Sequence, residues 1–224
     1  MKIISKLAAV ALVFAGAAQA DPITYIGADN GVSSLSQMVN STAAAGSFLS
    51  IAGSLNTVDF ESSVPANLSI SGGSITNNSG CGALCGFNTT AGGGFFVSVF
   101  GGTVTFNFTN PVDAFGFFVN GLQTNLVSQQ TIVYTNGASV SQTINMPSAI
   151  NGGGAFIGFI DYGQLISSVS FNATNDILAF DDLRFGRSEH NPTSPVPEPE
   201  TYAMMLAGLG LLGTIARRRK AKQA

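Results

Sequence analysis

Hydrophobic and polar residues alternate along most of the chain between positions 57 and 187. The clearest run is Thr103–Phe108, in which Val104, Phe106 and Phe108 fall on one face of a strand. Further strand-like runs occupy 67–71, 95–100, 114–119, 131–135, 139–144, 155–160, 167–171 and 177–185. Turn residues separate these runs, and Asn136-Gly137 suits a two-residue hairpin. Short strands without intervening helices predict an all-β domain over 57–187, an antiparallel β-sandwich or jelly roll.

The segment 21–56 is less regular than the domain that follows it. Within it, the stretch 33–45 carries apolar residues at a helix-like spacing, at Leu35, Met38 and Val39. Asn30 is a suitable cap and Gly46 a suitable end for such a helix. The pattern predicts one short helix that lies against the sandwich.

The first 20 residues have the three parts of a secretory signal peptide. Lys2 and Lys6 precede an apolar run over 7–18, and Ala18-Gln19-Ala20 is a small-x-small cleavage site. A first transmembrane helix is the alternative, but the apolar run is short and no basic stop follows it. We expect signal peptidase to cleave after Ala20.

The last 29 residues, 196–224, contain a second targeting signal. Pro197-Glu198-Pro199 is rigid and extended, 202–216 is uncharged, and a basic stop of four residues follows: Arg217, Arg218, Arg219 and Lys220. A helix over 202–216 spans roughly 22 Å, and long basic side chains can reach back to the interface of a hydrocarbon core about 30 Å thick. The positive-inside rule then places 21–200 outside the cytoplasm. A helix packed on the domain core is the alternative, but it has no use for four consecutive cations.

This order of Pro-Glu-Pro, hydrophobic span and basic end resembles the PEP-CTERM proteins, which are exported bacterial proteins sorted by an exosortase. The resemblance implies recognition at Pro197, Glu198 and Pro199, removal of the tail, and release or attachment at the cell envelope, often beside exopolysaccharide. The polar segment 188–195 reads as an exposed linker between the domain and this tail.

The charges of the predicted exported part are few and one-sided. The segment 21–189 contains ten acidic side chains and two basic ones, Arg184 and Arg187, which gives a net charge of −8. Nucleic acid is therefore excluded as a partner, since binding to phosphates needs clustered cations. A surface rich in Ser, Thr, Asn and Gly suits a protein of an extracellular matrix.

The two cysteines, Cys81 and Cys85, are close in sequence. In an exported chain, such a pair is expected to form a disulfide that closes a small loop. A zinc site is the alternative, but it needs four ligands and the chain has one histidine, His190, in the linker.

Enzyme chemistry has little support in the sequence. A nucleophilic pair would depend on His190, which a linker cannot orient. Glycoside hydrolysis needs only two carboxylates, so a secreted enzyme acting on polysaccharide is the alternative function, with a pair among Asp59, Glu61, Asp113 and Asp161. The absence of tryptophan, which stacks on sugar rings, weighs against it. We expect a non-enzymatic protein of the envelope or the extracellular polysaccharide matrix, structural or glycan-binding.

Alternation along 177–185 places Asp181 among apolar residues on one face of the last strand. A buried carboxylate needs a cation or several donors. The early Glu61 and the late Asp181-Asp182 resemble the ends of calcium-bearing, carbohydrate-binding-module-like jelly rolls, whose first and last strands lie side by side. This resemblance implies one structural calcium held by Glu61 and Asp181. The alternative is that both are surface acids at a sheet edge.

Overall fold

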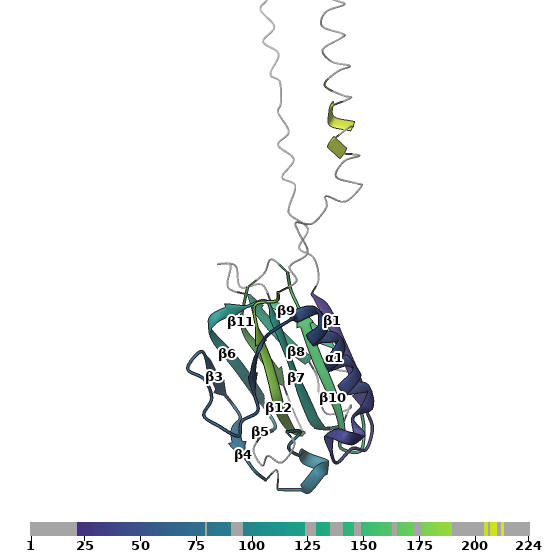
Figure 1. Ribbon diagram of the computed structural model, residues 1–224, viewed down its shortest axis with the longest axis vertical. Helices are drawn as coiled ribbons and strands as arrows, with labels where there is room; N and C mark the ends of the chain where they lie inside the picture. Colours follow the sequence, from purple (N-terminus) through teal and green to yellow (C-terminus); the bar gives the residue numbers. More distant parts are fainter. Residues whose placement is uncertain are drawn as a thin grey trace, which may run out of the picture.

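In the computed structural model, the described residues are 22–78, 80–90, 96–123, 129–134, 141–145, 149–162, 165–172 and 176–189, with isolated positions at 204–205, 207–209 and 212. They form two β-sheets packed face to face, with one α-helix on the outside of the larger sheet (Figure 1). The domain that residues 22–189 form, as far as they are described, is therefore an all-β sandwich with one α-helix, as predicted.

The larger sheet has seven strands. Its order is β1 (Ile23–Asp29), β10 (Gly153–Ile160), β7 (Ala114–Leu122), β12 (Ile177–Gly186), β5 (Phe96–Phe100) and β4 (Ser74–Thr76), with β2 (Asn56–Val58) also paired to β12. The smaller sheet runs β3 (Leu68–Ser71), β6 (Thr103–Val112), β11 (Ile166–Asn172), β8 (Gln129–Tyr134) and β9 (Ser141–Asn145). Every assigned pairing is antiparallel.

Phenylalanine dominates the core between the sheets. Phe117 of β7 meets Phe171 of β11 edge-on, with ring centroids 4.8 Å apart, and Phe180 of β12 packs on both. All three side chains are fully buried. Inward-facing aromatic residues from both sheets thus account for the alternating pattern of the sequence.

A second apolar cluster lies on the other face of the larger sheet, beneath α1 (Val39–Ala52). Phe48 of the helix sits over the neighbouring glycines Gly116 and Gly158, where an added Cβ would come within 3.0 and 2.9 Å of its ring. The helix can approach the sheet this closely because these two positions lack side chains. Strand β7 is consequently buried along its whole length.

The predicted helix exists, but its bounds differ. A 3₁₀ turn, η1 (Leu35–Gln37), precedes α1, and α1 continues through the exposed Gly46 to Ala52, where Gly53 closes it at φ 77°. Asn30 does not cap the helix, because its side-chain oxygen accepts the N–H of Ile150. The cap comes instead from Asp29, in the preceding strand.

β1 and β4, at the two edges of the larger sheet, lie outside the predicted runs. β1 lies in the segment that the sequence predicts to be irregular. It is an edge strand with Ile23 and Ile26 exposed, and its sequence therefore lacks clean alternation. β4, at the opposite edge, has only three residues. The predicted hairpin turn Asn136-Gly137 lies outside the described residues, although the strands on either side, β8 and β9, do pair.

Both ends of the domain lie at one end of the larger sheet (Figure 1). Ile23 pairs with Ile160, Ile160 with Ala114, and Ala114 with Gly186, so the start of β1 and the end of β12 share a row across four strands. Within the described residues, no helix combines the length and apolar character needed to cross a membrane. The predicted signal peptide and basic stop, and most of the predicted span 202–216, fall outside those residues.

Candidate functional site

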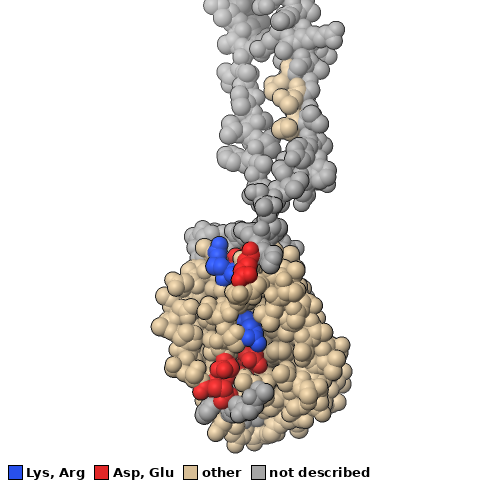
Figure 2. Space-filling model, viewed as in Figure 1, with Lys and Arg blue, Asp and Glu red and all other residues tan. Residues whose placement is uncertain are grey.

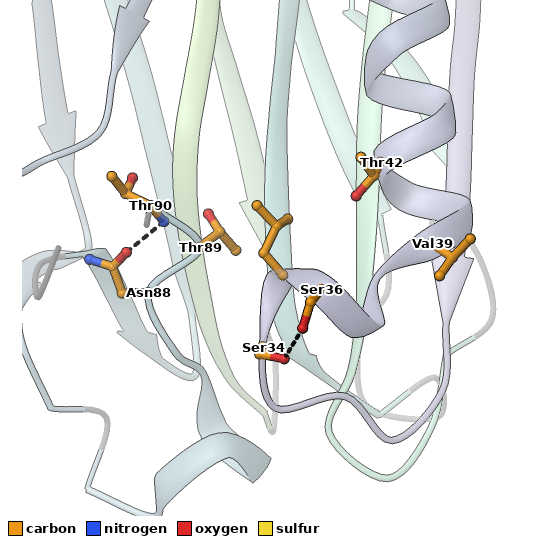
Figure 3. A pocket seen from close by; sticks show the side chains of 8 residues that line it. Ser34, Ser36, Val39, Thr42, Asn88, Thr89 and Thr90 are labelled. Atoms are coloured by element: carbon orange, nitrogen blue, oxygen red, sulfur yellow. Dashed lines mark hydrogen bonds between the residues drawn. The ribbon is translucent and has the colours of Figure 1, made fainter. Parts of the chain in front are cut away.

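A groove of 670 Å³ opens on the outer face of the larger sheet, between the start of α1 and the loop 86–90. Figure 3 shows Ser34, Ser36, Val39 and Thr42 on one side and Asn88, Thr89 and Thr90 on the other. Hydroxyl and amide groups supply its polar atoms, while Val39 and Leu35 supply apolar surface. None of the described lining residues carries a charge and most of the lining surface is apolar, so the groove suits an uncharged ligand.

The wall formed by loop 86–90 is fixed to the sheet by Asn120 of β7. Its side-chain oxygen accepts the N–H of Phe87 at 2.7 Å, and its amide donates to the carbonyl of Phe87 at 2.9 Å. Gly86 lies directly over Ala179 of β12, where an added Cβ would come within 2.2 Å of the Ala179 Cβ. The loop is therefore held against the strands by backbone contacts.

A β-bulge in β12 creates the floor of the site. The register to β7 shifts between Asp181 and Arg184, and Asp182 adopts the left-handed region at φ 48°. Phe180 precedes the bulge and Leu183 follows it, yet both lie in the core between the sheets. The predicted strict alternation over 177–185 is therefore wrong, because the extra residue changes the parity of the strand. Asp181 instead lies opposite Phe118, on the outer face.

Asp181 is fully buried and accepts several hydrogen bonds. Its Oδ2 accepts the backbone N–H of Thr89 at 2.7 Å, the hydroxyl of Thr89 at 2.9 Å and the N–H of Thr90 at 3.3 Å. Its Oδ1 accepts the N–H of Asp182 at 2.8 Å. Burial raises the pKa of Asp181 to about 7, and the neighbouring Asp182 charge adds to this, against the lowering effect of the donors.

Glu61 reaches the same loop from the other side. Asn88 donates its side-chain amide to Glu61, and the N–H of Glu61 contacts Asp59 at 3.2 Å. Glu61 was predicted to lie on the first sandwich strand, but β2 ends at Val58 because Phe60 turns the chain with φ 60°. β2 does pair with the last strand, through Val58 and Leu183, as the resemblance to jelly rolls implied.

The hydrogen bonds of Asp181 bear on the predicted calcium site. The oxygens of Asp181 that would face a cation face N–H and O–H groups of the protein instead. No cluster of three or more His, Cys, Asp or Glu side chains suited to a metal ion occurs within the described residues. The buried charge that motivated the calcium prediction is thus met by donors of loop 86–90. Calcium binding stays a prediction for direct measurement.

The predicted disulfide between Cys81 and Cys85 is formed. It closes the turn η2 (Gly82–Cys85), which leads directly into loop 86–90. The disulfide lies immediately before the groove wall in the sequence, and a closed loop this short adds little to the stability of the whole domain.

The remaining carboxylates of the predicted enzyme pair lie elsewhere. Asp113 and Asp161 are buried and adjoin each other through the N–H of Asp161 and the carbonyl of Asp113, at the end where the domain chain leaves the sheet. Asp113 also accepts the N–H of Ser188 at 2.6 Å and lies 3.5 Å from Arg187. This pair anchors the exit of the chain and does not line the groove.

Charged side chains are sparse on the face of the domain shown in Figure 2. Arg184 is one of the two basic residues between 21 and 189. Its guanidinium group donates to the hydroxyl of Thr57 at 2.6 Å and lies 4.0 Å from the carboxylate of Asp182.

Sequence reasoning missed the groove itself. The groove wall contains three polar residues that follow the cysteine pair, Asn88, Thr89 and Thr90. Their position depends on the bulge that begins at Asp181, 92 residues after Thr89. The available signal was the dipeptide Asp181-Asp182, two adjacent acids in a strand whose other charged residue is Arg184.

No curated protein matches this chain. Among solved structures, a variant of the family 29 carbohydrate-binding module CBM29-2 is similar at 12% identity over 65% of this chain and 99% of that chain, with a TM-score of 0.37. The cleaved adhesin domain of Lys-gingipain from Porphyromonas gingivalis is similar at 15% identity over 61% and 99%, with a TM-score of 0.32. CsCBM6-3 from Clostridium stercorarium, solved with cellobiose, is similar at 11% identity over 61% and 95%, with a TM-score of 0.30.

The sorting residues Pro197, Glu198 and Pro199 and the basic stop lie outside the described residues, so their assignment rests on sequence. A family model matches this region directly: residues 195–220 match the PEP-CTERM protein-sorting motif. The chain therefore carries, after its β-sandwich domain, the C-terminal motif of exported proteins that are sorted at the bacterial envelope.

Proposed function

We propose that this chain is an exported, non-enzymatic protein of the bacterial envelope or extracellular polysaccharide matrix, and that its sandwich domain binds a neutral glycan in the groove. The observation that carries the proposal is the groove lining, in which hydroxyl and amide groups are combined with Val39 and Leu35 and none of the described side chains is charged. Sugars present the same combination of hydroxyl groups and apolar C–H surface.

The charge of the domain narrows the class of glycan. With ten acidic and two basic side chains between 21 and 189, the domain repels polyanions, so uronic-acid-rich or sulfated chains are poor ligands. A neutral exopolysaccharide pays no such electrostatic cost.

The sorting motif supports the proposed route to that ligand. In this proposal signal peptidase removes 1–20, the tail holds the precursor in the inner membrane with the domain outside, and an exosortase then processes the tail. The domain meets exopolysaccharide only beyond the inner membrane.

The test measures binding of the processed protein, recovered from the producing bacterium, to the neutral exopolysaccharide of that bacterium. Ser36 is exposed in the groove, so Ser36→Phe fills it and is expected to weaken binding more than about tenfold, equivalent to about 1.4 kcal/mol. Ser50→Phe is the matched control, because Ser50 is exposed on α1 but lies outside the groove lining.

Equal affinity of the two variants would refute the groove as the binding site. Hydrolysis of the polysaccharide, abolished by a change at Asp59 or Glu61, would instead establish the alternative of a secreted enzyme.

A further inference from the structure

Three oxygen atoms form a short chain behind the groove wall. The Oγ of Thr89 lies 2.9 Å from Oδ2 of Asp181 and 3.0 Å from Oδ2 of Asp182. Both distances are those of hydrogen bonds, but a hydroxyl group has a single proton to donate. If both carboxylates were ionised, one of the two contacts would join an oxygen lone pair to a negative charge.

Solvent cannot relieve this mismatch. Asp181 has no exposed surface, Thr89 is 2% exposed and Asp182 is 9% exposed. The bulge turns two consecutive acids toward the same loop, whereas a regular strand would place them on opposite faces. Two like charges are thereby brought together in a dry environment, which strongly disfavours ionising both.

The charged groups around the pair are few. Arg184 lies 4.0 Å from Asp182 and is itself partly exposed, and Glu61 approaches through Asn88. Loop 86–90 carries no ionisable side chain, and neither do η1, α1, β5 or β7. Since Arg184 can neutralise only Asp182, the charge of Asp181 has no matching cation among the described residues.

We propose that Asp181 and Asp182 share one proton through the hydroxyl of Thr89 near neutral pH, and that this proton controls the Asn88–Thr90 wall of the groove. With the proton present, Asp181 donates to Thr89 Oγ, and Thr89 donates to Asp182. Every contact of the chain is then satisfied, and the wall is held against the sheet.

Loss of the proton leaves two carboxylates that compete for one hydroxyl. The wall is then expected to loosen, and the groove to lose its shape. The raised pKa of Asp181, about 7 against an ordinary 3.8, agrees with this order of events. Because the folded state holds the proton more tightly than the unfolded state, the free energy of unfolding falls as the pH rises from 3.8 to about 7.

The direct test follows the carboxyl carbons of the processed, carbon-13-labelled protein by NMR as a function of pH. The Cγ signal of Asp181 is expected to shift in one transition near pH 7. Asp182→Asn removes the neighbouring charge and should lower the Asp181 midpoint. Asp59→Asn is the control, because Asp59 contacts Glu61 rather than the pair, and it should leave the transition in place. A transition of Asp181 below pH 5 would overturn the proposal.

A calcium titration gives an independent readout. Thermal unfolding is expected to be the same with chelator and with added calcium, because the Asp181 oxygens already accept protein donors. A calcium-dependent rise in melting temperature that Asp181→Asn abolishes would mean that a cation, rather than a proton, occupies the pair, and would overturn the proposal.

The control of ligand binding rests on the proposed function. Affinity for the neutral exopolysaccharide is expected to be at least fivefold weaker at pH 8.5 than at pH 5.5 in the wild type, and nearly constant in Asp181→Asn. Binding that does not vary with pH in the wild type would overturn control of the groove. Absence of binding at every pH would refute the proposed function and this control, while the NMR transition would still report whether the proton is shared.

Discussion

Asp29 joins the first strand to the helix that covers it. One of its carboxylate oxygens accepts the N–H of Asn40 at 3.0 Å, and the other accepts the N–H of Ser41 at 2.9 Å and its hydroxyl at 2.6 Å. These are the free N–H groups of the first turn of α1, whose own cap residue, Met38, has no side-chain acceptor. Burial raises the pKa of Asp29, but hydrogen bonds from Ser41 and Asn40 outweigh it, so the pKa is lowered overall.

Asp29→Ala is therefore expected to lower the free energy of unfolding by about 1–2 kcal/mol, the usual cost of losing a helix cap. The stabilisation by Asp29 is present above pH 3.8 and is lost as the pH falls through its lowered folded pKa. Urea unfolding at pH 7 and at pH 3 measures both effects. Ser47→Ala, on an exposed turn of the same helix, is the control and should change stability little.

Two glycine-to-alanine substitutions, at Gly158 and Gly46, test how closely α1 packs on the sheet. Gly158→Ala places a Cβ 2.8 Å from the ring of Phe156 and 2.9 Å from that of Phe48, and the overpacking should cost about 1–3 kcal/mol. Gly46→Ala, in the exposed interior of α1 with nothing within 4 Å, should instead stabilise by about 1 kcal/mol. Thermal melts of the two variants should move in opposite directions, and equal shifts would contradict the close packing of α1.

Among the elements, the strands that bury one face and expose the other were predicted well from the sequence. β6, with Val104, Phe106 and Phe108, and β11, which pairs with it, follow period two because one face meets the core. The edge strand β1 was missed, because an edge strand is only partly buried and leaves a weak hydrophobic pattern. Asp181 was placed on the wrong face because a bulge depends on the register of two strands far apart in sequence, which local alternation cannot report.

Removing the disulfide between Cys81 and Cys85 tests how much the turn contributes to stability and to the groove. Replacing both cysteines by serine should lower the free energy of unfolding by about 2 kcal/mol or less, since the closed loop is short. The effect on the groove should be larger in proportion, because η2 leads into the Asn88–Thr90 wall. Denaturant unfolding and exopolysaccharide affinity measured on the same variant separate the two effects. A loss of stability without a loss of affinity would contradict the link between the turn and the groove.

In the whole molecule, the β-sandwich domain and the sorting tail were predicted from two different features of the sequence. The domain class followed from alternation and the tail from its tripartite composition, and both were correct. The groove was not predictable, because it joins residues of η1 and α1 with a loop some 50 positions away.

Changing Pro197, Glu198 and Pro199 together to alanine should leave an unprocessed, membrane-held precursor. Alanine allows the segment to become helical, whereas proline keeps it extended for a protease. Mass spectrometry of the cell envelope and the medium measures the processed fraction. The same change at Pro192 and Pro195, in the linker, is the control, and normal processing of the Pro-Glu-Pro variant would contradict recognition at that motif.

The shared row of Ile23 and Gly186 has a mechanical consequence. A force that pulls these two ends apart acts across the strands rather than along them, so it reaches the hydrogen bonds of the sheet one after another. β1, the edge strand, has a single neighbour and would peel from β10 while β12, which is paired on both sides, stays in the sheet. In an antiparallel sheet this peeling geometry yields at low force. A bacterium that held this domain by both ends would have a link that opens, whereas attachment through the β12 end alone leaves the whole sheet unloaded.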